Sequence, residues 1–127
     1  MKRLLFAVLA IVSCVRQPTY VEGGLYSVPG EGGKFTIVKI LRLEAQGVHV
    51  RVYSNAFAQR PSDVDESTLY MAGLDHKPGE SPGLGHAPIS RRSFATWGAQ
   101  FIKVVPVRDD ELNGYRMWLD AKGGFFD

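Results

Sequence analysis

Apolar and polar side chains alternate almost without exception along residues 47–54, which read GVHVRVYS. Val48, Val50 and Val52 occupy one set of alternate positions, and mostly polar residues occupy the other. A period of two is typical of a β-strand that is buried on one face. We therefore expect a half-buried strand here. Residues 34–44 (KFTIVKILRLE) and residues 25–28 (LYSV) are two further strand candidates, since both are rich in aliphatic, β-branched or aromatic residues.

The sequence EAQG at residues 44–47 joins the two longer strands and predicts a tight hairpin turn. We expect Gly47 to take a positive φ angle in that turn, because glycine carries no steric penalty there. The favoured register keeps apolar residues on one face. It places Leu43 opposite Val48 and Leu41 opposite Val50.

The opposite face of this hairpin brings Arg42 beside His49 and Ile40 beside Arg51. The longer strand is therefore apolar on both faces in its middle, because Val38 and Ile40 share the face that is otherwise polar. A strand of this kind is expected where one bent strand serves two sheets, as in a small barrel.

The rest of the chain predicts two short helices and one more strand. Residues 55–89 look irregular, with a possible short strand at 67–74 and a glycine- and proline-rich loop before residue 89. Ser90 is a suitable N-cap for a helix that ends near Gly98. Residues 100–107 follow as a strand, and residues 109–124 as a helix that begins with acidic residues and ends with Lys122 and glycine. We expect the two phenylalanines that follow to pack back onto the domain.

The segment GGLYSVPGEGGKFTIVKILRLEAQGVHVRVYSN, residues 23–55, resembles the opening meander of SH3-like small barrels, including Tudor and KOW-type domains. The shared features are a Gly-x-Tyr entry strand, a glycine-containing loop, a long bent second strand and a Gly-Val-x-Val third strand. The resemblance implies a mainly β fold, an SH3-like small barrel with one or two short helices. The segment contains no set of aromatic residues that would form a ligand cage, so no ligand is implied.

The N-terminus carries the three-part pattern of a secretory signal. Lys2 and Arg3 precede nine apolar residues, 4–12, and a polar stretch follows Cys14. The apolar run is too short to cross a bilayer, which takes about 20 residues. Ile11-Val12-Ser13-Cys14 resembles the lipobox of bacterial lipoprotein precursors, in which the cysteine is lipidated and the preceding peptide is removed.

This resemblance implies a signal peptide at residues 1–13, a lipidated tether at 14–23 and a single domain at 24–127. Cys14 would carry fatty acyl chains such as palmitate, and the protein would be a lipoprotein anchored to a membrane of the bacterial cell envelope. It would face the periplasm in a Gram-negative cell. Lipidation of the only cysteine also leaves no thiol for a disulfide within the chain.

Charge argues against a nucleic-acid partner. The chain has 15 basic and 13 acidic residues, but two of the basic residues, Lys2 and Arg3, belong to the expected signal. The expected mature chain is therefore close to neutral. A neutral domain lacks the positive surface that nucleic-acid binding requires.

Motifs for catalysis are missing from the sequence. It has no Gly-x-Ser-x-Gly nucleophile motif and no phosphate-binding loop that ends in Gly-Lys-Ser/Thr. The three histidines, His49, His76 and His86, lack the short spacing that is usual for metal ligands. His76 and His86 could still form a metal site in their loop with Asp75 and Glu80. We expect no catalytic residue, no metal and no cofactor.

The polar face of the 47–54 strand is the best candidate for a partner-binding surface, and its residues are Arg42, His49, Arg51 and Tyr53. Arginine and tyrosine are common among the residues that contribute most to protein interfaces. The alternative is that the C-terminal helix covers this face with Tyr115 and Trp118.

The function that we expect is that of a membrane-anchored, non-catalytic binding or adaptor lipoprotein. Its partner would be an envelope protein or a cell-wall component. The alternative is a small envelope hydrolase or a metal-binding protein that uses His76 and His86.

Lipidation of Cys14 is directly testable. Mass spectrometry of the mature protein is expected to show an acylated N-terminus at Cys14, because Ile11-Val12-Ser13 precedes this residue behind a charged start and an apolar run. Recovery of a chain that keeps residues 1–13 and a free thiol would contradict the prediction.

Overall fold

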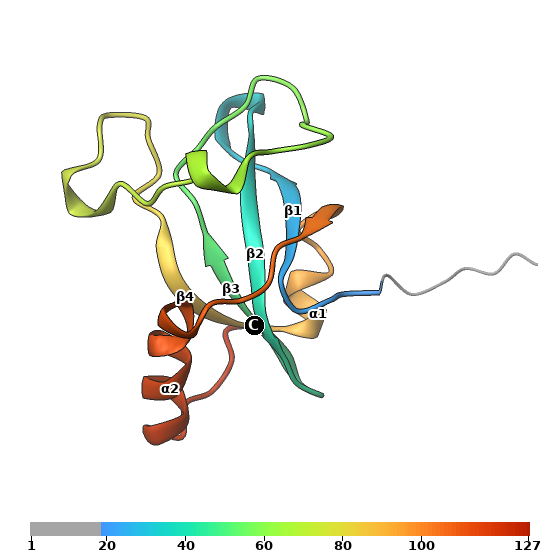
Figure 1. Ribbon diagram of the computed structural model, residues 1–127, viewed down its shortest axis with the longest axis vertical. Helices are drawn as coiled ribbons and strands as arrows, with labels where there is room; N and C mark the ends of the chain where they lie inside the picture. Colours follow the sequence, from blue (N-terminus) through green and yellow to red (C-terminus); the bar gives the residue numbers. More distant parts are fainter. Residues whose placement is uncertain (1–18) are drawn as a thin grey trace, which may run out of the picture.

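The computed structural model describes residues 19–127, which form one five-stranded antiparallel sheet with short helices around it (Figure 1). Cys14 and the lipobox-like residues lie outside the described part. The strands are β1 (Gly24–Pro29), β2 (Phe35–Leu43), β3 (Gly47–Val52), β4 (Leu84–Ser90) and β5 (Gln100–Val104). Their order in the sheet is β4-β3-β2-β1-β5. The predicted class, mainly β with accessory helices, is confirmed.

The helices are short. They are α1 (Arg91–Phe94), α2 (Asn113–Asp120) and the 3₁₀ turns η1 (Glu31–Gly33), η2 (Glu66–Thr68), η3 (Gly73–Asp75) and η4 (Asp109–Leu112). The predicted N-cap is present, since the Ser93 backbone N–H donates to the Ser90 hydroxyl oxygen over 3.1 Å. The predicted strand at 67–74 is wrong. Asp65 instead accepts a hydrogen bond from the Ser67 N–H and starts η2.

Strand β4 was missed by the sequence analysis, which placed most of it in a loop. Its sequence, LGHAPIS, contains a glycine and a proline and gives no clear alternation. It forms a strand because it pairs with β3, with Val48 opposite Ile89 and Val50 opposite Ala87. Partner strand and burial therefore override a weak local preference.

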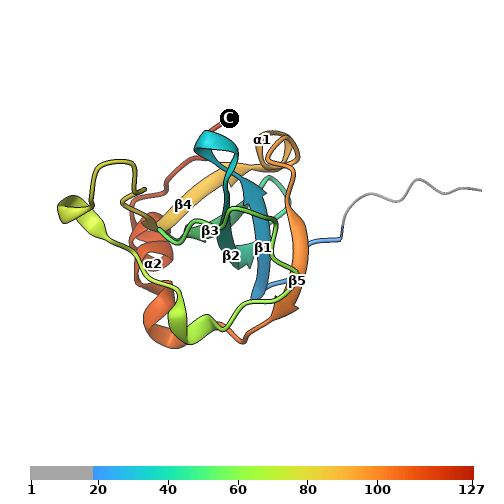
Figure 2. The same cartoon turned by 90° about the horizontal axis from the view of Figure 1, so that it is seen from above.

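The expected closed barrel does not form. Strands β4 and β5 lie at the two ends of the sheet order and are not hydrogen-bonded to each other. Seen from above, the strands follow an arc whose open side faces α2 and the loop that leads from β3 to β4 (Figure 2). The fold is an open, curved sheet.

Two apolar cores lie on opposite faces of this one sheet. The first contains Val38, Ile40, Val48 and Val50 with Phe94 of α1, and the second contains Leu25, Ile37, Tyr53 and Val64. Strand β2 contributes to both cores through adjacent residues, which explains its apolar character on both faces. The apolar residues on both faces of this strand are therefore explained by one sheet that is covered on both faces, and not by a strand shared between two sheets.

The predicted hairpin between β2 and β3 is confirmed at its turn. The Glu44 N–H donates to the Gly47 carbonyl oxygen over 3.0 Å, and Leu43 lies opposite Val48 and Arg42 opposite His49. Beyond Arg42 the register shifts, so that Ile40 rather than Leu41 lies opposite Val50, and Lys39 rather than Ile40 lies opposite Arg51. Leu41 is the extra residue of a β-bulge, which the alternation of side chains could not reveal.

Gly47 is required for a reason other than the expected one. It is not among the residues with positive φ. A Cβ atom at this position would lie 2.3 Å from the Phe125 ring and 2.7 Å from the Ile89 carbonyl oxygen. The turn is therefore glycine because the C-terminal tail, residues 121–127, packs directly on it.

Both ends of the described chain pack on the sheet. In the expected tether, Tyr20 lies edge-on to Phe94, and the Gly23 N–H donates to the Ile40 carbonyl oxygen over 2.7 Å. At the other end, Phe126 forms a parallel bridge with Ile89 of β4. Phe125 packs inward as expected, while the Phe126 side chain stays exposed. Within residues 19–127, no helix combines the length and apolar character needed to cross a membrane.

Burial of the first core predicts how stability responds to truncation. Val50→Ala is expected to lower the free energy of unfolding by about 1–3 kcal/mol, because Val50 is fully buried in that core. Val104→Ala on β5 is the matched control, since that valine is 51% exposed. Chemical denaturation of both variants measures the difference. Equal losses at the two positions would contradict the assignment of the core.

Candidate functional site

The four residues predicted to bind a partner divide into two pairs. Arg42 and His49 lie where α2 and the C-terminal tail pack on the sheet, whereas Arg51 and Tyr53 line a cavity further along β3. The expected exposure is wrong for two of them, because His49 is 0% exposed and Tyr53 is 5% exposed. The alternative, a face covered by the C-terminal helix, therefore applies to one pair only.

His49 is covered by three aromatic rings. Its ring centroid lies 4.5 Å from that of Trp118, 4.8 Å from that of Tyr115 and 5.3 Å from that of Phe125. Helix α2 can approach this closely because Gly114 faces β4, where a Cβ atom would lie 2.5 Å from the His86 Cβ. A glycine inside a predicted helix was thus a signal of close packing.

His49 and His86 form a histidine pair. Nδ1 of His49 and Nε2 of His86 are 2.9 Å apart, and the rings are stacked with an interplanar angle of 13°. Glu44 lies 3.6 Å from His49 Nε2 and accepts a hydrogen bond from the Tyr115 hydroxyl over 3.1 Å. The pair shares one hydrogen bond, so at least one of the two facing nitrogens must be unprotonated.

Burial lowers the pKa of both histidines below its ordinary value. For His49 the opposing effect of the Glu44 carboxylate is smaller than that of burial, and for His86 the neighbouring His49 lowers the pKa further. The pair is therefore held in the neutral state, which suits its place under α2.

The alternative metal site, built on His76 and His86, is not assembled by these contacts. His86 is engaged with His49, whereas His76 is exposed and its Nδ1 lies 3.1 Å from the Lys77 carbonyl oxygen. Within residues 19–127, no group of three or more histidine, cysteine, aspartate or glutamate side chains is arranged to hold a metal ion.

A buried ammonium group lies next to the second pair of predicted residues. Lys39 of β2 is 0% exposed, and its Nζ donates to Glu66 Oε2 over 2.8 Å, to Glu111 Oε1 over 3.0 Å and to the Pro106 carbonyl oxygen over 3.3 Å. The three acceptors can therefore use all three N–H donors of the ammonium group. Sequence reasoning missed Lys39, although a lysine between two buried aliphatic residues was a visible signal.

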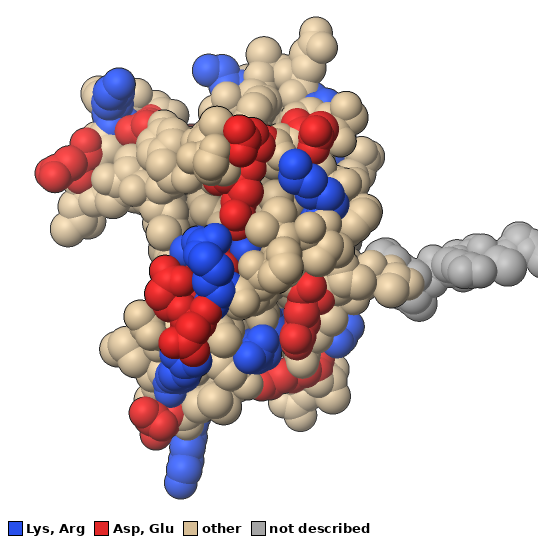
Figure 3. All heavy atoms as spheres, viewed as in Figure 1, with Lys and Arg blue, Asp and Glu red and all other residues tan. Residues whose placement is uncertain are grey.

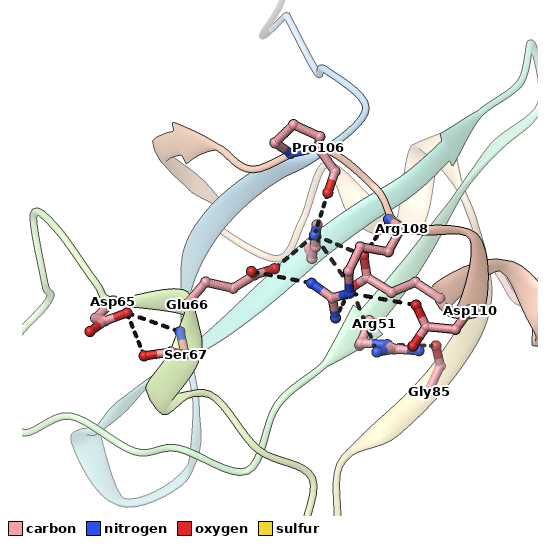
Figure 4. A network of polar contacts seen from close by, with 10 residues as sticks. Arg51, Asp65, Glu66, Ser67, Gly85, Pro106, Arg108 and Asp110 are labelled. Carbon is pink, nitrogen blue, oxygen red and sulfur yellow. Dashed lines mark hydrogen bonds and ion pairs between the residues drawn. The ribbon is translucent and has the colours of Figure 1, made fainter.

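Two arginines border the same carboxylates (Figure 4). Arg108 Nη1 lies 3.3 Å from Glu66 Oε1, and its Nη2 lies 3.5 Å from Glu111 Oε2. Arg51 Nη1 lies 3.6 Å from Glu111 Oε2, and its Nε donates to the Gly85 carbonyl oxygen over 3.3 Å. We call Lys39, Arg51, Glu66, Arg108 and Glu111 the charge cluster. It ties β2 and β3 to η2 and η4.

A cavity of about 400 Å³ opens beside the charge cluster, and we call it the Arg51 cavity. It is lined by Arg51, Tyr53, Glu66, Ser67, Leu69, Tyr70, Met71 and Arg108. Burial, supported by the nearby Glu111 carboxylate, raises the pKa of Tyr53 to about 12. The Tyr53 hydroxyl is therefore neutral and able to donate a hydrogen bond. The cavity combines cationic and hydroxyl donors with an aromatic and aliphatic wall.

The surroundings distinguish this cavity from a larger one. A cavity of about 460 Å³ lies between η1 and residues 76–82, where Glu31, Lys34 and His76 are exposed and Glu80 is half-buried. A third cavity, of about 450 Å³, lies beside Glu44, Trp118 and the C-terminal tail. Of these three cavities in the described part of the chain, the Arg51 cavity alone is lined by members of the charge cluster. On the face shown in Figure 3, positive and negative side chains are interspersed and no large area of a single sign is present.

Comparison of the chain with protein-family models, with curated proteins and with solved structures found no match.

The histidine pair predicts a pH-dependent stability. A pKa that is lowered on folding means that the unfolded chain binds protons more readily. The stabilisation is thus fully present above about pH 6.5 and is lost as the pH falls below that value. Thermal melts followed by circular dichroism are expected to show that the melting temperature falls as the pH is lowered from about 7.5 to about 5.5.

Two variants measured in the same way show whether the histidine pair causes this pH dependence. The double variant His49→Gln with His86→Gln removes both titrating groups and is expected to flatten this dependence, whatever its absolute stability. His76→Gln, at an exposed histidine, is expected to keep it. An unchanged slope in the double variant would show that the pair is not responsible.

Proposed function

We propose that this protein is a lipid-anchored, non-catalytic binding module of the bacterial cell envelope, and that it holds a partner protein at the Arg51 cavity. The N-terminal signal and the lipobox-like Cys14 support the anchoring. The single observation that carries the binding proposal is the composition of the cavity, where two arginines meet two tyrosines and a methionine. These residue types are enriched at protein interfaces.

Apolar exposure beside the cavity supports a protein partner. Tyr70, Met71 and Leu84 are each more than a third exposed. They belong together, because Gly83 approaches Met71 so closely that a Cβ there would lie 2.9 Å from the Met71 Cβ. An apolar surface next to paired guanidinium groups offers both the buried centre and the polar rim of an interface.

Binding accounts for the chemistry of the site better than catalysis does. The Lys39 ammonium is bonded to two carboxylates and has no lone pair with which to act as a base or nucleophile. His49 is covered by aromatic rings and shares its Nδ1 with His86. The polar groups that line the Arg51 cavity are the two guanidinium groups, the Tyr53 and Ser67 hydroxyls and the Glu66 carboxylate, a mainly donating set that suits recognition.

The test is site-specific photocrosslinking in intact cells. A photoreactive phenylalanine analogue at position 70 is expected to capture a partner protein, because Tyr70 borders the Arg51 cavity. The same analogue at Phe101, which is exposed on β5, is the matched control and is expected to give no such product. Arg51→Ala in the position-70 protein is expected to reduce the crosslinked product at least several-fold.

Three results bear directly on the proposal. Loss of the product on Arg51→Ala, with an unchanged melting temperature, would support it. Equal capture at positions 70 and 101, or capture that survives Arg51→Ala, would overturn it. Tyr53 is not used as the probe position, because it is buried and its replacement by a larger group would disturb the second core.

A further inference from the structure

The Arg51 cavity contains donors that lack protein acceptors. Among the described residues, the Tyr53 hydroxyl has no hydrogen-bond partner, and although the residue is only 5% exposed, its hydroxyl is not one of the enclosed polar atoms and lines the cavity. Arg51 is also incompletely engaged, since the only carboxylate near its terminal nitrogens among residues 19–127 lies 3.6 Å away. These donors therefore remain open to water or to an acceptor atom of a ligand.

The two glutamates of the charge cluster do not fill this role. Glu66 makes its shortest contact, 2.8 Å, with Lys39, and Glu111 Oε1 accepts from the Arg108 backbone N–H over 2.8 Å and from Lys39 over 3.0 Å. The contacts of both carboxylates with the guanidinium groups of Arg51 and Arg108 are longer, at 3.3–3.6 Å. Hydrogen bonds between guanidinium and carboxylate groups are usually about 2.7–2.9 Å long. The arginines therefore retain capacity for another acceptor.

The local charge favours an acceptor with a single negative charge. Lys39, Arg51 and Arg108 supply three positive charges, and Glu66, Glu111 and Asp110, which lies 3.5 Å from Arg108, supply three negative ones. These charges balance, so a bound carboxylate adds one uncompensated negative charge and a doubly charged phosphate group adds two. A carboxylate is therefore the better match.

We infer that the Arg51 cavity recognises an aspartate or glutamate side chain in a partner segment, held between Arg51, Arg108 and the Tyr53 hydroxyl. This inference rests on the proposed function and names the chemistry of the same site. An internal residue fits better than a chain end, because the apolar surface of Tyr70, Met71 and Leu84 continues beyond the cavity and provides contacts for neighbouring residues of a continuing chain.

The test uses the full-length, ¹⁵N-labelled protein in detergent micelles and a blocked peptide, acetyl-Ala-Glu-Leu-amide. Nuclear magnetic resonance titration is expected to shift the Arg51 side-chain signal and the backbone signals of residues 51–53 and 69–71. Acetyl-Ala-Gln-Leu-amide, which differs only in the charged group, is expected to bind about tenfold more weakly, as is usual when a hydrogen bond to a charged group is lost.

Tyr53→Phe is the sharpest variant, because it removes only a hydroxyl group that has no protein partner among the described residues. It is expected to keep the melting temperature and to weaken binding of the glutamate peptide roughly fivefold to tenfold. Tyr115→Phe, at a tyrosine bonded to Glu44, is the matched control and is expected to leave peptide binding unchanged.

Two further probes separate the carboxylate side chain from other anions. They are acetyl-Ala-Gln-Leu with a free C-terminal carboxylate and acetyl-Ala-phosphoserine-Leu-amide. Tighter binding of either one than of the glutamate peptide would overturn the inference, as would equal binding of the glutamate and glutamine peptides or an unaffected Tyr53→Phe variant. If crosslinking from position 70 still depends on Arg51, such a result leaves the proposed function intact and rejects only the inference that the cavity recognises a carboxylate side chain.

Discussion

The buried ammonium group of Lys39 constrains how the second face of the sheet is covered. A lysine in the middle of a central strand cannot be left without partners, because an unpaired buried charge costs several kcal/mol. Its partners come from distant segments, Glu66 in η2 and Glu111 in η4. The loop after β3 and the approach to α2 must therefore meet over β2. Removal of one partner would cost more than the pair contributes, since the remaining charge would be stranded.

This constraint creates the site. With Glu66 and Glu111 drawn onto Lys39, Arg51 and Arg108 make longer contacts at the edge of the cluster and keep donors directed toward the cavity. The second core is continuous with the site, because Tyr53 packs its ring in that core and directs its neutral hydroxyl to the cavity. The binding surface that we propose thus joins Arg51 of β3 and the adjacent Tyr53 to Arg108 and to residues 66–71 of the segment between β3 and β4. Tyr70 and Met71 of that segment and Leu84 at the start of β4 provide its apolar rim.

The other end of the same face is closed by close packing. Gly114 lets α2 approach His86, and Gly47 makes room for Phe125. Three aromatic rings then cover His49, whose histidine pair is kept neutral by burial. Packing and polar contacts therefore divide one strand face into two regions, a covered region at Arg42 and His49 and an open cavity at Arg51 and Tyr53.

Local signals in the sequence predicted much of the framework. Alternation indicated β3, the turn at residues 44–47 fixed the start of the hairpin register, and Ser90 and the acidic residues 109–111 indicated the two helices. Each of these signals depends on residues close together in the chain. The presence of Arg51 and Tyr53 at a candidate site was also visible, because their residue types are typical of interfaces.

Contacts between distant residues decided the rest. Strand β4 exists because β3 offers it a partner, the bulge at Leu41 changes which residues face each other, and the sheet stays open because β4 and β5 do not meet. The exposure of His49 and Tyr53 could not be read from their own strand, since it depends on what packs above them. By itself the sequence determined which residues alternate, turn and cap. Only the tertiary structure determined which polar groups are covered and which donors remain open, because burial and charge pairing are properties of the assembled chain.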